Sequence, residues 1–348
     1  MSGELEETPV VIRSISPPIG LPGGEVTLFC DGLDPLSLDD ESLHFCGSVA
    51  MIEGASPQKL VTHIPENTWS NEVSIIQHGI ESNEYRFIVP RCVGNALHSM
   101  TSPAVTRENE VLATFCGMPG QLTPVSVFLI HSHHGKQSFS GGLHNIGALT
   151  VDGNQRVWAA SRSEGVLYIL KPDGGHVVIA DGFENPCALA AFEDEIYCAE
   201  LSGRISIVQA DGRKELLAEI EPSEISIHLA MSRTGLLYAS STQRIGENAI
   251  WNISRNGTVK EFVRALMEFH GMGFDATNAL YVAVTERGSG GIDMYHVGST
   301  ERQRVVSGQD IVGMAFDAHN DMYIATFNKM YLVHNRHLMM AWNAVRKK

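Results

Sequence analysis

The sequence predicts an all-β protein in two parts, a small β-sandwich followed by a ring of six four-stranded sheets. Three observations carry this prediction. Similar short segments recur about every forty residues between residues 102 and 323, hairpin turns fall between them, and residues 9–92 break the period with denser strands. The chain has 348 residues, of which 33 are Gly and 14 are Pro, so it is long enough for two domains rich in turns.

Residues 9–92 are expected to form the sandwich. They hold six or seven alternating segments separated by Gly and Pro turns, among them LHFCGSVA, KLVTHIPE and EVSIIQHG. This density of strands in about eighty residues fits an Ig-like sandwich of two packed sheets. The stretch RCVGNALHSM at 91–100 would link the sandwich to the ring, which we place at residues 93–345.

Six segments define the repeat of the second part. Each is a short apolar strand, a polar turn and a second strand that begins with an apolar or aromatic marker residue. The markers are Leu112, Trp158, Tyr197, Tyr238, Tyr281 and Tyr323, and the spacings between them are 46, 39, 41, 43 and 42 residues. Repeats of this length are typical of solenoids and propellers.

Tight turns out of phase with the markers show how each period continues. SHHGK, KPDGGH, QADGRK and SRNGTV each follow an alternating run, and Asp-Gly or Asn-Gly at such a place predicts a hairpin. Four strands in each of six periods predict a six-bladed β-propeller. Two closures of the ring are possible. Residues 337–345 form the outer strand of the last blade, or the chain end folds as a short helix and the ring closes in another way.

Charge and cysteine content narrow the class of protein. Residues 1–100 contain 14 acidic and 4 basic side chains, so they carry −10 of the total charge of −15. Nucleic acid requires clustered cations and anionic lipid repels an acidic surface, so neither is an expected partner. The acidic start, with no apolar run, predicts a cytoplasmic protein without a signal peptide or membrane span. The six cysteines lack metal-like spacing and are expected to be buried thiols.

Residues three positions before the first strand of each segment should meet at one mouth of the propeller channel. They are Ser99, Asn145, Asn185, Ile225, Glu268 and Asp310. Ca²⁺ and Mg²⁺ prefer oxygen ligands, so we expect Asn145, Asn185, Glu268 and Asp310 to hold such a cation, which would polarise a carbonyl. Ser99, Asn145 and Asn185 are expected to contact a small-molecule substrate.

Histidines supply the candidate proton acceptors. His228 begins the blade-four segment and His270 directly precedes the blade-five segment, so both should face the channel. An imidazole there can act as a general base, and the alternative is a hydrogen-bonded histidine that only packs the ring. The run HSHH at 131–134 is expected on an exposed outer turn, and no GxSxG, HExxH or P-loop motif occurs.

Two family resemblances rest on these residues. Pro17, Gly20, Gly23, Gly24, Val26, Gly32, Gly47, Pro65 and the segment 82–89 resemble an IPT/TIG domain, which has an Ig-like fold. Residues 94–337, with HGMGFDATNALYVA and VGMAFDAHNDMYIA, are similar to the NHL-repeat and gluconolactonase-like six-bladed propellers. The two parts in this order resemble bacterial proteins that join an IPT/TIG domain to a gluconolactonase-like propeller.

The gluconolactonase resemblance implies a metal held by two acids and two amides at the channel mouth. The sequence departs from that pattern near LHSMTSP, where the family's acid is absent, and at His270, where the lactonases have Asp.

The first functional hypothesis is a lactonase-like enzyme for small molecules. A bound cation would activate the carbonyl of a lactone or ester, and His270 or His228 would move the proton; a non-hydrolytic reaction on a biosynthetic intermediate is an alternative at the same site. The second hypothesis is a non-catalytic binding or scaffold protein, whose propeller face and acidic sandwich dock a partner.

Overall fold

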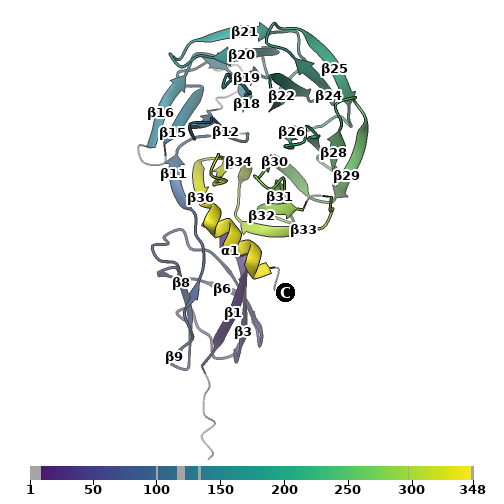
Figure 1. Ribbon diagram of the computed structural model, residues 1–348. Coiled ribbons are helices and arrows are strands. Elements are labelled where there is room, and N and C mark those ends of the chain that lie inside the picture. The colour runs from purple at the N-terminus through teal and green to yellow at the C-terminus, as the bar shows by residue number, and fades with distance from the viewer. Residues whose placement is uncertain (1–8, 99–100, 116–121, 132–134, 297, 346–348) are drawn as a thin grey trace, which may run out of the picture.

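The computed structural model describes residues 9–98, 101–115, 122–131, 135–296 and 298–345 (Figure 1). Within these ranges every regular element is a β-strand, except the helix α1 (Asn335–Val345). The all-β prediction is therefore confirmed for the described chain.

Residues before Arg91 form two small antiparallel sheets around a hydrophobic core that includes Ile15, Leu28, Phe45 and Ile75. Alternate residues of β3 (Glu25–Asp31) are buried, as expected where one face of a strand packs on a core. The first sheet contains β1 (Val11–Ser16), β3 (Glu25–Asp31), β7 (Lys59–His63) and β6 (Ile52–Ser56). The second contains β10 (Tyr85–Arg86), β8 (Glu72–Gln77), β4 (Leu43–Phe45) and β5 (Ser48–Val49), with β9 (Ile80–Glu81) beside β8.

Residues from Arg91 onward form six sheets that radiate from a common centre (Figure 1). Sheet 1 contains β12 (Ala104–Val105), β13 (Val111–Thr114), β15 (Val127–His131) and β16 (Gly135–Ser140), and the short pair β14 (Leu122–Thr123) and β17 (Leu143–His144) follows. Sheet 2 contains β18 (Ile146–Val151), β19 (Val157–Ser161), β20 (Val166–Leu170) and β21 (His176–Ala180). Sheet 3 contains β22 (Pro186–Phe192), β23 (Glu195–Glu200), β24 (Arg204–Val208) and β25 (Lys214–Glu219).

The remaining three sheets complete the ring. Sheet 4 contains β26 (Ser226–Met231), β27 (Leu237–Thr242), β28 (Asn248–Ile253) and β29 (Val259–Ala265). Sheet 5 contains β30 (Glu268–Phe274), β31 (Leu280–Glu286), β32 (Ser289–Tyr295) and β33 (Arg302–Ser307). Sheet 6 contains β34 (Ile311–Phe316), β35 (Met322–Thr326), β36 (Lys329–Val333) and β11 (Arg91–Asn95). Neighbouring inner strands contact one another all the way round, and β34 reaches β12.

The sequence repeat is the hairpin between the two innermost strands of each sheet. Every marker residue lies in or next to the second strand and pairs with an inner-strand residue: Leu112 with Ala104, Trp158 with Thr150, Tyr197 with Ala190, Tyr238 with Ala230, Tyr281 with Gly273 and Tyr323 with Ala315. The second strands β19 and β35 are buried throughout, which explains why they appear as unbroken apolar runs.

Asx residues in these hairpins tie adjacent sheets together. Asp275 Oδ1 accepts backbone N–H groups of its own turn, from Thr277 and Ala279, both at 2.9 Å. The positive-φ residue at the same turn accepts an N–H from the preceding sheet, and this contact recurs from Arg233 to Asn278, from Ala276 to Asn320 and from Ala318 to Asn109. The last of these links sheet 6 to sheet 1.

The outer strand of sheet 6 comes from before the ring. β11 pairs antiparallel with β36, with Cys92 opposite Tyr331, so residues 91–95 form a strand where the sequence suggested a linker. The chain end forms α1 instead, which is the second of the two closures that the sequence left open. The helix forms because Leu338 is buried against the ring and Asp321 Oδ1 accepts the Asn335 N–H at 2.7 Å at the helix start.

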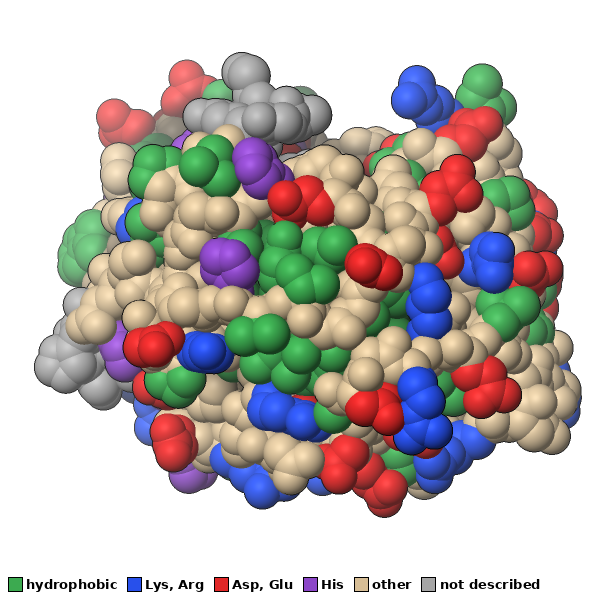
Figure 2. All heavy atoms as spheres, turned by 90° about the horizontal axis from the view of Figure 1, so that it is seen from above, with side chains coloured by type: hydrophobic (Ala, Val, Ile, Leu, Met, Phe, Trp, Pro, Cys, Tyr) green, Lys and Arg blue, Asp and Glu red, His purple; other side chains and the backbone are tan. Residues whose placement is uncertain are grey.

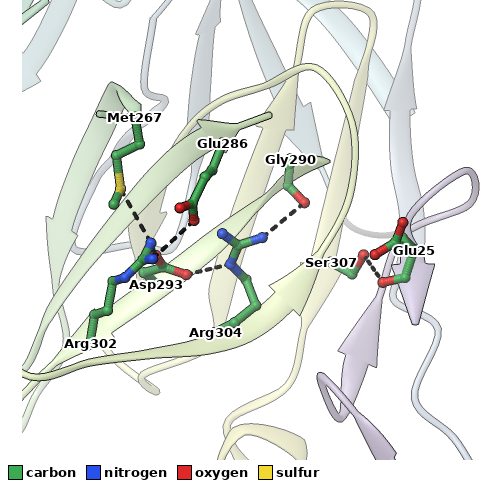
Figure 3. Close-up of polar contacts among 8 residues, drawn as sticks. All are labelled: Glu25, Met267, Glu286, Gly290, Asp293, Arg302, Arg304 and Ser307. Carbon is green, nitrogen blue, oxygen red and sulfur yellow. Dashed lines mark hydrogen bonds and ion pairs between the residues drawn. The ribbon is translucent and has the colours of Figure 1, made fainter. Parts of the chain in front are cut away.

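The two parts of the chain meet at sheet 5. The short strand β2 (Ile19–Gly20) lies parallel to β33, and the Leu21 N–H donates to the Ser307 carbonyl at 2.8 Å. Ser307 Oγ donates to the Glu25 carbonyl at 2.6 Å (Figure 3). Beside this seam the two parts line a cavity of about 380 Å³.

The outer edge of the ring carries a mixed surface. Figure 2 views this edge from the side of β21 and shows a group of hydrophobic side chains near the middle of the face, with acidic and basic ones around it. The edge strands contribute exposed Val177, Val178 and Leu216. Among the described helical residues, none forms a segment long and apolar enough to cross a bilayer. Cys92 is exposed, the other four described cysteines are buried free thiols, and Cys116 lies outside the described residues.

Candidate functional site

A cavity of about 580 Å³ opens where the inner strands of sheets 4, 5 and 6 begin. The first residues of these strands line it, together with residues at the ends of second strands. Because the second strand runs antiparallel to the first, its end returns to the same mouth, as Thr285 opposite Glu268 shows. The lining includes Ser226, His228, Glu268, His270, Asp310, Val312, Arg162, Thr285 and Phe327.

Further along the same strands the channel is lined by uncharged residues. A second cavity, of about 280 Å³, is lined by residues of all six inner strands, including Ala190, Gly273 and Ala315. This lining confirms that the inner strands converge on one axis. Its described residues include no ionisable side chain, so the titratable groups of the channel lie at the first mouth.

The structure brings together half of the expected metal ligands. Glu268 and Asp310 line the large cavity, whereas Asn145 and Asn185 are not among its lining residues. Ser99 and the part of the histidine-rich run at 132–134 lie outside the described residues.

The backbone gives an independent reason for Asn and Asp at these positions. Asn145, Asn185 and Asp310 have φ values of 44°, 58° and 56°, in the left-handed region that Asn and Asp tolerate better than most residues. A column of such residues therefore reflects a turn geometry shared by sheets 2, 3 and 6, in addition to any role in binding.

His228 is held in its uncharged form. Its Nε2 lies 3.0 Å from Ser226 Oγ, a neutral partner. Burial, with smaller contributions from the nearby His270 and Arg162, lowers the pKa of His228 to about 3. The imidazole is therefore neutral at physiological pH.

His270 stands on the adjacent inner strand in a similar state. Its Nε2 lies 3.1 Å from Thr285 Oγ1 and 3.9 Å from Glu268 Oε2. Burial lowers the pKa of His270, and the Glu268 carboxylate partly offsets that effect. Both predicted histidines thus face one cavity as potential proton acceptors.

Arg162 and Thr285 were missed by the sequence reasoning. The alignment of repeats considered only the start of the inner strand, whereas these residues lie at the end of the second strand. The marker residues could have identified them. Each marker lies near the start of a second strand of about five residues, and the end of that strand returns to the mouth where the inner strand begins. Arg162 directly follows the last residue of β19.

The two carboxylates provide only part of a metal donor set. Glu268 and Asp310 are both exposed at the cavity. No group of three or more His, Cys, Asp or Glu side chains suited to a metal ion occurs among the residues that the structure describes. A complete shell would therefore need the amide oxygens of Asn145 and Asn185 or water.

The neutral state of His228 predicts a pH dependence of stability. Its folded pKa lies below the ordinary value of 6.5, so only the unfolded chain takes up a proton as the pH falls below 6.5. This part of the stability is complete above pH 6.5 and is lost as the pH falls toward 3. Between pH 7 and 4.5, His228→Gln should lose on the order of 2 kcal/mol less than the wild type in urea unfolding. Equal slopes for His228→Gln and the wild type would contradict the prediction.

Comparisons with known proteins identify structures with a similar fold. No family model matches the sequence, and no curated protein is detectably similar. A protein of unknown function from Bacteroides thetaiotaomicron is 15% identical, with a TM-score of 0.56 over 94% of this chain and 98% of that one. A gluconolactonase from Xanthomonas campestris is 14% identical, with a TM-score of 0.54 over 69% of this chain and 88% of its own.

A virginiamycin B lyase from Staphylococcus aureus has a similar ring, at 14% identity and a TM-score of 0.50 over 69% of this chain and 97% of its own. The chain has a β-propeller fold. At these identities the likeness concerns the fold alone, and it includes propellers named for hydrolysis and for a lyase reaction. The function of this propeller must therefore be argued from its own cavity.

Proposed function

We propose that the protein is a lactonase-like enzyme that opens a lactone or ester in the 580 Å³ cavity, with His270 as the proton acceptor and His228 beside it. The observation that carries the proposal is the pair of neutral imidazoles on the contacting inner strands β26 and β30. A neutral imidazole has a lone pair that can take a proton from water at physiological pH.

In this mechanism water attacks the carbonyl carbon while its proton passes to His270. The tetrahedral intermediate then collapses, the bond between the acyl carbon and the alcohol oxygen breaks, and the imidazolium returns its proton to that oxygen. Thr285 Oγ1, 3.1 Å from Nε2, orients the ring. The Glu268 carboxylate, 3.9 Å away, stabilises the imidazolium while it exists.

The architectural part of the proposal is an Ig-like sandwich of the IPT/TIG kind followed by a six-bladed propeller. Two sheets around a common core and six radiating sheets support it. The similarity to a gluconolactonase supports the lactone class through the fold. The fold also serves a lyase, so elimination at the same histidines is the outcome to look for if hydrolysis is absent.

Substitution of His270 tests the proposed activity. We expect the wild type to hydrolyse members of a panel of lactones and aryl esters, and His270→Gln to lower kcat/KM by about 10²–10⁴ because the general base is lost. His63→Gln is the matched control and should retain full activity. Undiminished activity in His270→Gln, or no turnover of the panel by the wild type, would overturn the proposal. Ligand capture without turnover would instead favour the binding-protein hypothesis.

A divalent cation at Glu268 and Asp310 is a separate part of this proposal; Asn145 and Asn185, which lie outside the cavity lining, or water would complete its shell. When bound it would polarise the substrate carbonyl. Ca²⁺ or Mg²⁺ should raise the melting temperature, since a ligand at 100 times its Kd stabilises the folded state by about 2.7 kcal/mol. The shift should disappear in Glu268→Ala and Asn185→Ala and persist in Glu53→Ala, which removes an exposed carboxylate. A wild type that shows no shift removes the cation and leaves the histidine mechanism standing.

A further inference from the structure

We infer that the cavity selects small molecules in which a free carboxylate accompanies an apolar ring or chain, and that Arg162 binds the carboxylate. The inference rests on the proposed function for the reaction that follows. Its evidence is separate, because it comes from the surroundings of Arg162 and from the apolar part of the cavity lining.

Arg162 lacks the carboxylate partner that a buried guanidinium usually has. Its Nε is buried and has no hydrogen-bond partner in the described part of the structure. No ion pair among the described residues includes Arg162. Seven of the other described arginines do pair with Asp or Glu: Arg13, Arg156, Arg213, Arg255, Arg264, Arg302 and Arg304. The guanidinium lines the cavity without a carboxylate beside it, so a carboxylate ligand would make charge-assisted hydrogen bonds with it.

The backbone of sheet 2 holds Arg162 at this place. Its N–H donates to the Asn145 carbonyl at 3.1 Å, and its side chain crosses β18 at Gly147. A Cβ atom at Gly147 would lie only 2.6 Å from Arg162 Cγ and Cδ. The absence of a side chain at Gly147 therefore gives the stem of Arg162 its path to the cavity. The guanidinium also lies near Cys187. Burial raises the pKa of that thiol, and the positive charge of Arg162 partly offsets this effect.

Charge is distributed unevenly around the cavity. Arg162 acts on His228, whose pKa its charge lowers, whereas Glu268 lies beside His270. Asp310 is exposed at the start of β34. An anionic group is therefore attracted to the Arg162 and His228 side and repelled from the Glu268 side. This polarity would orient an ester so that its anionic end points away from Glu268.

Four apolar side chains also line the cavity. Ile225, Ile311, Val312 and Phe327 contribute to the cavity wall, and the side chains of Ile225 and Phe327 are 42% and 44% exposed. Large apolar side chains left exposed at a concave surface bind apolar ligand groups by releasing water. The ligand class that satisfies both features is an amphiphilic carboxylate.

Benzoate and benzamide are matched probes of this inference, since they share a ring and differ in the anionic group. In calorimetric or NMR titrations of the full chain, we expect benzoate to bind at least tenfold more tightly than benzamide. Arg162→Gln should abolish this preference, Arg162→Lys should retain part of it, and the exposed-site control Arg213→Gln should retain all of it. Equal binding of the two probes by the wild type, no binding of either, or an undiminished preference in Arg162→Gln would each overturn the inference.

Gly147→Ala offers a second variant that leaves Arg162 in place. The added methyl group should displace the arginine stem and reduce the preference for benzoate while the melting profile stays cooperative; an unchanged preference would contradict the assigned path. His270→Gln separates this inference from the proposed function. It should lose ester hydrolysis and still prefer benzoate, so a failure of catalysis and a failure of carboxylate recognition give different results.

Discussion

Val93→Asp is expected to destabilise the protein by on the order of 4 kcal/mol. Val93, on β11, is 8% exposed and packs in the core shared with Ile130 and Tyr323, where the strand closes sheet 6. The substitution removes the burial of a valine, which contributes about 1.5–3 kcal/mol, and places a carboxylate where water is excluded. Urea unfolding at neutral pH measures the loss, a large part of the stability of a typical domain.

Asn95→Asp is the matched control for this experiment. It adds the same charge at an exposed position of the same strand, so the free energy of unfolding should change by less than about 0.5 kcal/mol. If Val93→Asp were as stable as Asn95→Asp, β11 would not be the strand that closes the ring.

Asp293→Ala is expected to cost about 3 kcal/mol. The Asp293 side chain is 1% exposed and pairs with Arg302, at 3.0 Å, and with Arg304 (Figure 3). Removing one partner of a buried ion pair leaves the other charges uncompensated, which typically costs about 3–5 kcal/mol. The two arginines are 37% and 24% exposed, so water recovers part of that cost and the lower end of the range applies.

Asp211→Ala provides the comparison for Asp293. Asp211 pairs with Arg213 at the surface, where both side chains are more than half exposed. Loss of such a solvent-screened pair should have little effect on the free energy of unfolding. Chemical denaturation of the two variants under the same conditions should therefore separate them clearly, and similar losses would contradict the structural role assigned to Asp293.

The six-fold repeat was predictable from the sequence because it depends on local patterns. Markers such as Tyr281 and Tyr323 recur once per hairpin, and the polar turn before each of them, with Asp275 or Asp317, satisfies its own backbone. Such patterns depend only on residues that are close in sequence, so they can be recognised without the structure.

The closure of the ring was not predictable in the same way. β11 and β36 pair across more than two hundred residues of chain, and a short strand with a single buried side chain, such as β11, fits several partners equally well. The segment 91–95 carries no feature that distinguishes a linker from an edge strand until its partner is present. The chain end had a clearer helical option, which the burial of Leu338 and the contact of Asn335 with Asp321 select.

Part of the candidate site was predictable from the sequence, and part was not. His228 and His270 were expected at the channel because each repeat places its inner-strand start at one mouth, and the structure places both in one cavity with Glu268 and Asp310. The sequence by itself determined the strand content, the period and these channel-facing positions, since all of them follow from local spacing. Only the tertiary structure decided that Arg162 and Thr285 join that cavity, that Asn145 and Asn185 do not line it, and that β11 closes the ring. Those outcomes depend on how strands distant in sequence pack around a common axis, and burial and charge at that axis then determine the protonation of the histidines.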